Sequence, residues 1–410
     1  EPTLYHSQVR LGGPSQQQRL TQLFTFAVQH ILEGIQNDLK LSSDELVVEV
    51  LLTSIQSLSA CLLGVGAKRG TGSTAKACPA LNLPQELAGM ILECLFRILQ
   101  SSLQRRAVFN ARVKCLEMDE DELEMLQEDM SVDEDLQYQV TDSVGVVCKV
   151  FGPRALPCLE KSFVNQIQMM CDPRCPNGDR RYGVFMLDDI FEHSVRYASE
   201  DVRVRYYKTL FPCIVSCLNV PIRYDAEGSL SPPDVPGLIQ AAAYGVGVAA
   251  RFGRKCFQHF EADIVRRMVA LLQDAKLSQL ASMRVCLDNI VASLGHILES
   301  GNHQGKELWD LFFSRLPLSA DLEESRNMLE LLLRLLSKNS LGNNNRLGQA
   351  LAVFLTALSI PDLCDKNHQK LRDTLVMSIR QIRSRVPQNA LSGLVSSLSP
   401  NARRAFSMIK

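Results

Sequence analysis

Apolar residues recur at the spacing of an amphipathic helix over almost the whole chain. One such stripe runs through residues 47–62 and another through residues 328–336. The alternating pattern of a β-strand is nearly absent. Breaks at turn-forming residues predict helices over residues 17–37, 43–65, 85–115, 136–151, 155–171, 179–198, 200–219, 236–252, 255–273, 279–299, 305–315, 321–338, 345–358, 366–385 and 400–409.

The predicted helices form pairs that repeat along the chain. The central apolar residues of the second helices are Val146, Leu187, Tyr244, Ile290, Leu331 and Val376. The intervals between them are 41, 57, 46, 41 and 45 residues, and four of the five agree with the period of about 40–47 residues of HEAT and armadillo repeats. Because stacked hairpins bury the apolar face that one hairpin cannot, the pattern predicts an all-α fold. We expect one HEAT-like α-solenoid over residues 1–410, wound into a right-handed superhelix.

Two segments interrupt the helical pattern. Residues 67–84 are rich in Gly, Ala and Pro, and residues 221–236 contain four prolines, which cannot continue a helix. Helical hairpins resume on both sides of each segment. We therefore interpret the two segments as exposed linkers within one solenoid and expect no domain boundary at either.

The composition limits the possible classes of function. A chain of 410 residues with 46% hydrophobic residues can bury a large core, and a net charge of -1 lacks the basic surface of a non-specific nucleic-acid binder. No stretch reaches the roughly 20 apolar residues of a membrane span, and no signal peptide is present. The pattern thus predicts neither a nucleic-acid nor a membrane partner. The 13 cysteines form no repeating framework, which favours free thiols in the cytosol or nucleus.

Acidic residues are concentrated in residues 117–135. This acidic run contains 11 Asp and Glu and no Lys or Arg, so the remainder has 44 basic against 34 acidic residues, a net charge of +10. Mutual repulsion predicts an extended or transiently helical segment that clamps a basic partner. Alternatively, it is a solvated loop partly neutralised by basic residues of the preceding helix. The candidate binding residues are Asp119, Glu120, Asp121, Glu122, Glu124, Glu128, Asp129, Asp133, Glu134 and Asp135.

A second acidic group lies on the predicted helix over residues 179–198. Asp188 and Glu192 are four residues apart and Asp189 and Glu192 three apart, so a regular helix places them on one face. On an inward-facing helix they would accept Lys or Arg from a partner. Alternatively, they pair with arginines of the same helix or face water.

Motifs for catalysis, cofactors or metals are absent from the sequence. Cys171 and Cys175, like Cys213 and Cys217, lack the matched second pair of a zinc site. His193, one helical turn after Asp189, has no nucleophile motif near it. The glycine-rich residues 64–73 follow a predicted helix, whereas a phosphate-binding loop follows a strand. We therefore expect a binding protein, not an enzyme, without a cofactor.

Several segments resemble the importin-β (karyopherin-β) nuclear transport receptors, most closely the importin beta-3 class. QAAAYGVGVAARFG at residues 240–253 resembles the second helix of a repeat, and DRRYGVFMLDDIFEHS at residues 179–194 resembles another repeat of this class. The acidic run precedes them, and Trp309 with SRLPL and a terminal LSP near Leu398 follow in the same order. The resemblance covers roughly residues 90–410.

The resemblance implies the C-terminal part of a nuclear import receptor that shuttles between cytoplasm and nucleus. Such a receptor binds cargo with basic import signals and phenylalanine-glycine nucleoporins. It releases cargo when Ran-GTP binds, mainly to N-terminal repeats that are absent here. In this family an Asp at the start of the second helix and an Arg several residues later can hydrogen-bond between successive repeats. Here Asp234 is followed by Gln240, so this series of hydrogen bonds is weakened at this repeat. Residues 221–236 are also longer than the family's tight turn. The alternative is a static HEAT-repeat scaffold for a multiprotein complex.

Overall fold

The computed structural model describes residues 14–39, 45–66, 82–114, 120–253, 255–301, 305–342 and 344–409. Over these residues the chain consists of helices and connecting loops, and the β-pairing there is one isolated bridge between Tyr224 and Leu230. The predicted all-α class is therefore confirmed. The contacts divide the chain into two compact units, Glu1–Tyr206 and Tyr207–Lys410.

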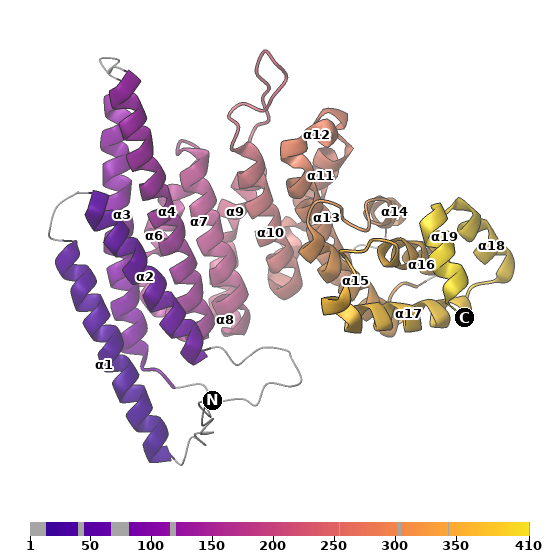
Figure 1. Ribbon diagram of the computed structural model, residues 1–410, viewed down its shortest axis with the longest axis horizontal. Coiled ribbons are helices and arrows are strands. Elements are labelled where there is room, and N and C mark those ends of the chain that lie inside the picture. The colour runs from indigo at the N-terminus through magenta and orange to yellow at the C-terminus, as the bar shows by residue number, and fades with distance from the viewer. Residues whose placement is uncertain are drawn as a thin grey trace, which may run out of the picture. The chain divides into compact units, whose positions relative to one another are not determined.

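The first unit is built from three pairs of helices. α1 packs on α2, α3 packs on α4, and the short helix α6 packs on α7, while α5 packs on α3 and α6. The second helices α2, α4 and α7 lie side by side (Figure 1). The elements are α1 (Pro14–Asp38), α2 (Glu45–Gly66), α3 (Gln85–Lys114), α4 (Glu120–Phe151), the 3-10 turn η1 (Gly152–Ala155), α5 (Leu156–Ser162), α6 (Val164–Met170), α7 (Asn177–Asp189), the π-helical turn η2 (Ile190–Ser194) and the 3-10 turn η3 (Val195–Tyr197).

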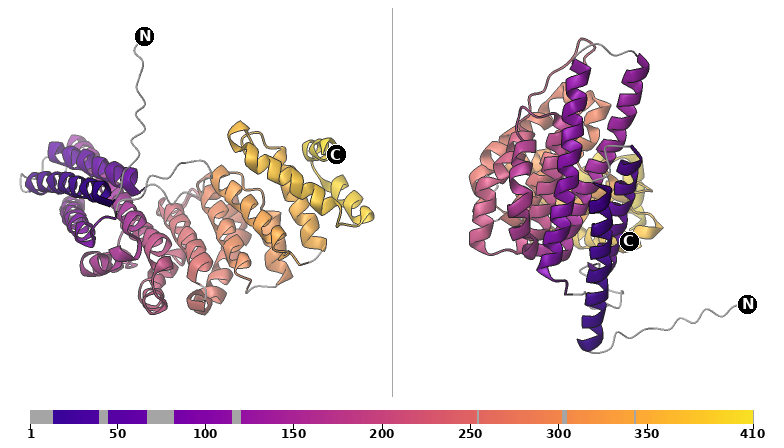
Figure 2. Two further views of the ribbon diagram at one scale, coloured as in Figure 1. Left: turned by 90° about the horizontal axis from the view of Figure 1, so that it is seen from below. Right: turned by 90° about the vertical axis from the view of Figure 1, so that its left-hand side faces the viewer.

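The second unit repeats this plan. After α8 (Glu200–Thr209), which contains the boundary, α10 contacts α13, α13 contacts α15 and α15 contacts α17 (Figure 2). These helices carry the predicted repeat markers. The elements are α9 (Phe211–Leu218), α10 (Val235–Gly253), α11 (Lys255–Gln273), α12 (Ala275–Gln279), the 3-10 turn η4 (Ala281–Met283), α13 (Arg284–Glu299), α14 (Lys306–Ser314), α15 (Leu322–Ser337), α16 (Asn344–Leu358), the 3-10 turn η5 (Lys366–His368), α17 (Gln369–Arg383), α18 (Gln388–Ser397) and α19 (Pro400–Met408).

Neighbouring repeats are joined by apolar packing and by close backbone approach. Ile55 on α2 and Leu331 on α15 are fully buried, and burial of such side chains contributes about 1.5–3 kcal/mol each. Between α10 and α13, the hydroxyl of Ser293 donates a hydrogen bond to the carbonyl of Ala243. A Cβ on Gly247 would lie 2.9 Å from the Ser293 Oγ atom, so glycine is needed for this approach.

Some predicted boundaries are wrong. The largest error concerns α4, which begins at Glu120 and includes the acidic run from that residue on, where we expected an extended or transiently helical segment before a helix that begins at residue 136. The negative charge lies at the N-terminal end of this helix, where the helix dipole favours it. Residues 155–171 contain the end of η1 followed by α5 and α6. Pro157 lies in the first turn of α5, and α5 and α6 meet at Phe163, which keeps helical backbone angles. The apolar pattern did not predict α18, whose serines and glycine have low helix propensity.

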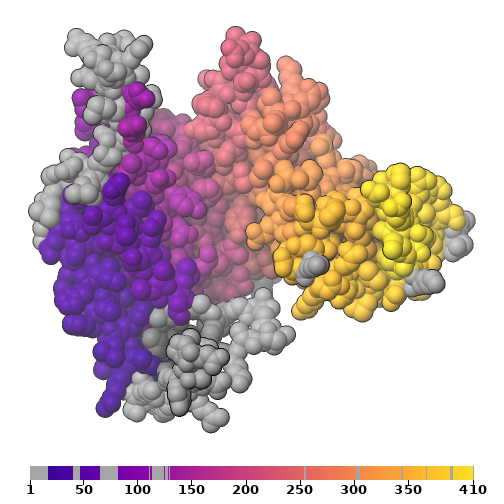
Figure 3. Space-filling view, in the orientation of Figure 1, coloured from indigo at the N-terminus to yellow at the C-terminus, as the bar shows by residue number. Residues whose placement is uncertain are grey.

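The two predicted linkers differ from the expectation at their ends. Residues 67–81 lie outside the described residues, but Leu83 in the rest of the first linker is buried. In the second linker, residues 225–229 are exposed at the tip of a protruding loop (Figure 3). Leu230 and Val235 are buried, and Val235 begins α10. Exposure is therefore confirmed for the loop tip and wrong for its base.

One helix is long and apolar enough to cross a membrane by length and composition. This window on α2, Val47–Gly64, has a mean hydropathy of 1.7, and 33% of it is buried within the structure. The sequence-based statement that no stretch approaches such a span is therefore too strong. Its buried side packs against α1 and α4, which is also the behaviour of a core helix in a helical stack.

Candidate partner-binding surface

Asp133, near the end of the acidic run, is a structural residue. It is only 4% exposed and accepts a hydrogen bond of 2.8 Å from the Ser102 hydroxyl. The Arg105 guanidinium donates to its other oxygen, with an Nε distance of 3.1 Å. Because both carboxylate oxygens are occupied by α3, Asp133 joins α3 to α4 and does not face a partner.

Arg106 extends this polar cluster to the next pair of helices. Its side chain donates a hydrogen bond of 2.7 Å to the Gln137 amide oxygen. It forms ion pairs of 3.1 Å with Asp179 on α7 and 3.6 Å with Glu134 on α4. Burial raises the pKa of Asp179, and the charge of Arg106 partly opposes that shift. The expected neutralisation by basic residues of α3 is therefore present, although within a helix and not a loop.

The other described carboxylates of the run leave one acidic surface. Glu124, Glu128 and Asp135 are exposed and lie four and seven residues apart, the spacing of one helical face. We call these three residues the α4 acidic face. Tyr138, three residues further along and 56% exposed, continues it. Asp119 lies outside the described residues. The structure places Glu120, Asp121, Glu122 and Asp129 on α4 and does not describe their side chains.

The predicted group on α7 does not form one exposed acidic face. Asp188 is buried, whereas Asp189 and Glu192 are partly exposed. The Asp189 carboxylate lies 3.4 Å from the His193 Nε2 atom. The cause is the packing of α7. Asp188 lies on the side that the fold buries, whereas Asp189 and His193, four residues apart across the π-helical turn η2, share the partly exposed side. The prediction of a shared face is therefore wrong.

Asp189 instead faces α4 across a glycine. A Cβ on Gly145 would lie 2.1 Å from its Oδ2 atom, so only glycine leaves room for this carboxylate. Burial raises the pKa of Asp142 on α4; the charge of Lys149 opposes this shift, and repulsion from Asp189 adds to it. Asp142 on α4 and Asp189 on α7 therefore bring negative charge from two helices close to Lys149 and His193.

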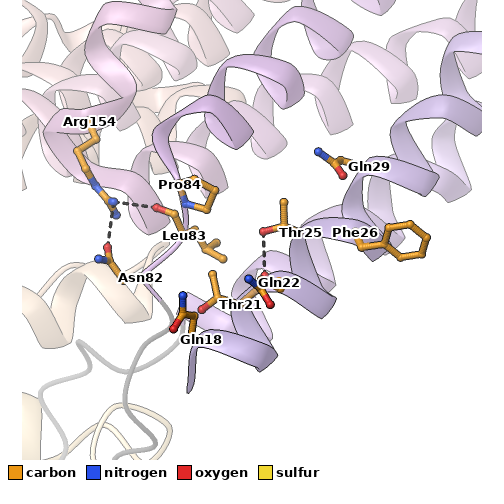
Figure 4. Close-up of a pocket in the computed structure, with 10 residues that line it drawn as sticks. All are labelled: Gln18, Thr21, Gln22, Thr25, Phe26, Gln29, Asn82, Leu83, Pro84 and Arg154. Atoms are coloured by element: carbon orange, nitrogen blue, oxygen red, sulfur yellow. Dashed lines mark hydrogen bonds between the residues drawn. The ribbon is translucent and has the colours of Figure 1, made fainter. Parts of the chain in front are cut away.

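A cleft beside α1 is a second candidate surface, and sequence reasoning did not identify it. Its volume is about 480 Å³, and it lies between α1 and the segment that leads into α3 (Figure 4). Arg154 closes one side by donating to the Asn82 amide oxygen at 3.2 Å and the Leu83 carbonyl at 2.8 Å. Phe26 is 61% exposed, and the remaining lining is mostly Gln and Thr. This lining suits an uncharged, partly apolar partner.

The His, Cys, Asp and Glu side chains that could bind a metal ion do not cluster in the described part of the chain. No group of three or more His, Cys, Asp or Glu there has the arrangement of a metal site. The 11 cysteines among these residues are free thiols.

The fold defined by these stacked helical pairs is that of the karyopherin HEAT-repeat solenoids. The chain matches a triple mutant of Kap121p with a TM-score of 0.61 and 15% identity, over 96% of this chain and 30% of that chain. It also matches the karyopherin Kap121p bound to the extreme C-terminus of the protein phosphatase Cdc14p, with a TM-score of 0.55, 15% identity and coverage of 95% and 30%. The match to Kap121p bound to Nup53p has a TM-score of 0.51 and 14% identity, and it covers 96% of this chain and 36% of that chain.

These comparisons establish the fold and set its extent. The predicted HEAT-repeat solenoid is confirmed, and the fold is that of the solved karyopherin structures. The chain spans about a third of the length of the solved karyopherins that it matches. No protein-family model matches it.

Proposed function

We propose that the chain is the C-terminal part of a nuclear import receptor of the importin beta-3 class. The observation that carries the proposal is the karyopherin fold over 96% of the chain. In this proposal the protein acts by binding and has no catalytic step. Kap121p, which shares the fold, is solved in complexes with Cdc14p, Nup53p and other proteins. We infer corresponding partner classes for this chain.

Cargo with a basic import signal is proposed to bind along the α4 acidic face. Its three carboxylates are exposed one and then two turns apart along α4, so an extended basic segment would meet them in order. Asp142 and Asp189, which lie near the end of α4, would receive a further Lys or Arg. A charged hydrogen bond contributes about 1.5–3 kcal/mol when it is desolvated and about 0–1 kcal/mol when it is exposed. Affinity therefore depends on how completely the bound cargo covers these carboxylates.

Phenylalanine-glycine nucleoporins are proposed to bind in the cleft beside α1. Phe26, which is 61% exposed, offers an apolar contact to a phenylalanine ring, and the Gln and Thr side chains can bond an extended backbone. We further propose release of cargo by Ran-GTP in a longer receptor and shuttling between cytoplasm and nucleus.

The decisive experiment neutralises the α4 acidic face by replacing Glu with Gln and Asp with Asn at its three positions. A fluorescent basic peptide should bind about tenfold more weakly at low salt, since three exposed contacts of about 0.5 kcal/mol each are lost. The matched control replaces three exposed glutamates of the second unit, Glu307, Glu323 and Glu330, by Gln. An equal loss in both variants would show non-specific attraction and reject the assignment.

A static HEAT-repeat scaffold is the alternative function. Ran-GTP distinguishes the two, because a receptor loses cargo when Ran-GTP binds and a scaffold is indifferent. Pull-downs of cargo with the longer receptor, with and without Ran-GTP, measure this difference. Undiminished cargo in the presence of Ran-GTP would favour the scaffold.

A further inference from the structure

The last helices of the second unit carry a concentrated positive charge. Residues 366–410 contain nine Lys and Arg against one acidic residue, Asp373, in a chain of net charge -1. α16 and α18, which pack beside α17 and α19, contain no acidic residue. Asp373 itself accepts a hydrogen bond of 2.7 Å from the Gln369 amide. Asp373 is therefore the one carboxylate within the helices α16, α17, α18 and α19, whereas glutamates lie on α15, which contacts α17.

Packing brings the ends of α17 and α19 together (Figure 1). Arg383 on α17 donates a hydrogen bond to the carbonyl of Ile409, and its guanidinium lies 4.7 Å from the centre of the Phe406 ring. Arg385 donates to the Asn339 amide oxygen at 2.9 Å. These contacts fix α19 against α17, so the basic residues of both helices are held on a rigid support.

The helices that meet at this junction also carry exposed arginines and methionines. Met377 is 61% and Met408 is 77% exposed, which is unusual for a side chain of this type. We call the following residues the C-terminal basic surface: Arg380, Arg385, Arg403 and Arg404, with Met377 and Met408. Guanidinium groups bind carboxylates in a bidentate manner, and methionine adapts its shape to apolar side chains. The surface therefore combines two recognition chemistries.

We propose that the C-terminal basic surface docks an acidic peptide segment that also carries Leu, Met or Phe side chains. The carboxylates pair with the arginines, and the apolar side chains cover the two methionines. A nucleic acid would satisfy the arginines through phosphate, but its backbone would leave the exposed methionines in water. The partner is opposite in charge to the basic cargo proposed for α4, so the two proposals stand or fall separately.

The test measures fluorescence anisotropy with a labelled peptide in which Asp and Glu alternate with Leu and Met. The triple variant Arg380→Glu, Arg403→Glu and Arg404→Glu should weaken binding at least about tenfold at low salt. The matched control reverses three exposed cations elsewhere in the second unit, at Arg223, Lys255 and Arg266, and should change binding less than about twofold. Unchanged binding in the triple variant, or an equal loss in the control, would overturn the proposal.

Further arms test the apolar contribution and the other occupants. Met408→Gln, at an exposed position, should weaken the same peptide about threefold and leave the salt dependence unchanged. Single-stranded DNA of equal length should bind more weakly than the peptide. Tighter DNA binding, or dimerisation of the chain that the triple variant abolishes, would assign the surface to nucleic acid or to a second copy and overturn the proposal. Helical circular dichroism of each variant confirms that it folds.

Discussion

Replacement of Asp133 by Asn separates the structural part of the acidic run from the part that faces partners. The side chain of Asp133 is almost completely buried, and its two oxygens accept hydrogen bonds from Ser102 and Arg105. Asn keeps the size and one acceptor but removes the charge that the arginine compensates. The perturbation therefore removes one ion pair with little change in packing volume.

The expected loss of stability follows from these contacts. Removing one partner of a buried ion pair costs about 3–5 kcal/mol. The Arg105 side chain is 24% exposed, so water can partly solvate the cation that is left, and Asn retains one hydrogen bond. We therefore expect a loss of about 2–3 kcal/mol, confined to the contact of α3 with α4.

The assay combines urea unfolding, followed by circular dichroism, with hydrogen exchange of α3 and α4. Asp133→Asn should lower the midpoint and the protection of these helices while affinity for a basic peptide changes little. Asp135→Asn changes an exposed residue two positions away. It should weaken binding of the basic peptide and change the unfolding midpoint little. A change below about 0.5 kcal/mol for Asp133→Asn, together with weaker peptide binding, would refute the structural role assigned to this carboxylate.

Three further predictions concern packing, pH and thiol chemistry. Gly295→Ala places a Cβ 2.8 Å from a buried methionine sulfur and a phenylalanine ring, so it should lower the free energy of unfolding by about 1–3 kcal/mol. At Gly34 nothing lies within 4 Å of the added Cβ, so Gly34→Ala should raise the free energy of unfolding by about 0.5–1 kcal/mol. Urea unfolding midpoints of the two variants test this difference. Burial of Glu299 opposes its ionisation, but the nearby His296 and two hydrogen bonds from Arg334 outweigh that cost and lower its pKa from 4.5 to about 2. The ionised Glu299 therefore contributes its full stabilisation of the fold above about pH 4.5 and loses it as the pH falls toward 2. The wild-type unfolding midpoint should fall between about pH 5 and pH 3, and Glu299→Gln should make that fall smaller. An equal fall in the variant would contradict the ion pair. Burial raises the pKa of Cys148 to about 12, which keeps this thiol protonated and unreactive. Mass spectrometry after alkylation of the folded protein should therefore show modification of the exposed Cys61 and none of Cys148. After unfolding, Cys148 should be modified as well.

The sequence alone determined the helical class, the repeat interval and most helix positions. Apolar spacing carries this information because each helix must turn one stripe toward its neighbours, and stacked pairs must repeat that stripe at the interval of the repeat. The marker residues Leu331 and Ile290 accordingly lie buried on successive packed helices. The resemblance to the importin-β receptors also led to the correct fold.

The tertiary structure decided which carboxylates serve packing and which face a partner. Asp133 and Asp135 are two residues apart in one acidic run, yet Asp133 is buried against α3 and Asp135 is exposed. Charge repulsion within the run predicted an extended chain because the compensating Arg105 and Arg106 lie about thirty residues away and meet it only after α3 and α4 pack. Likewise, the packing of α7 buries Asp188 and leaves Glu192 partly exposed, which their spacing in the sequence does not show. Local spacing fixes a helix and its apolar stripe, whereas the environment of each charge depends on residues that only folding brings near.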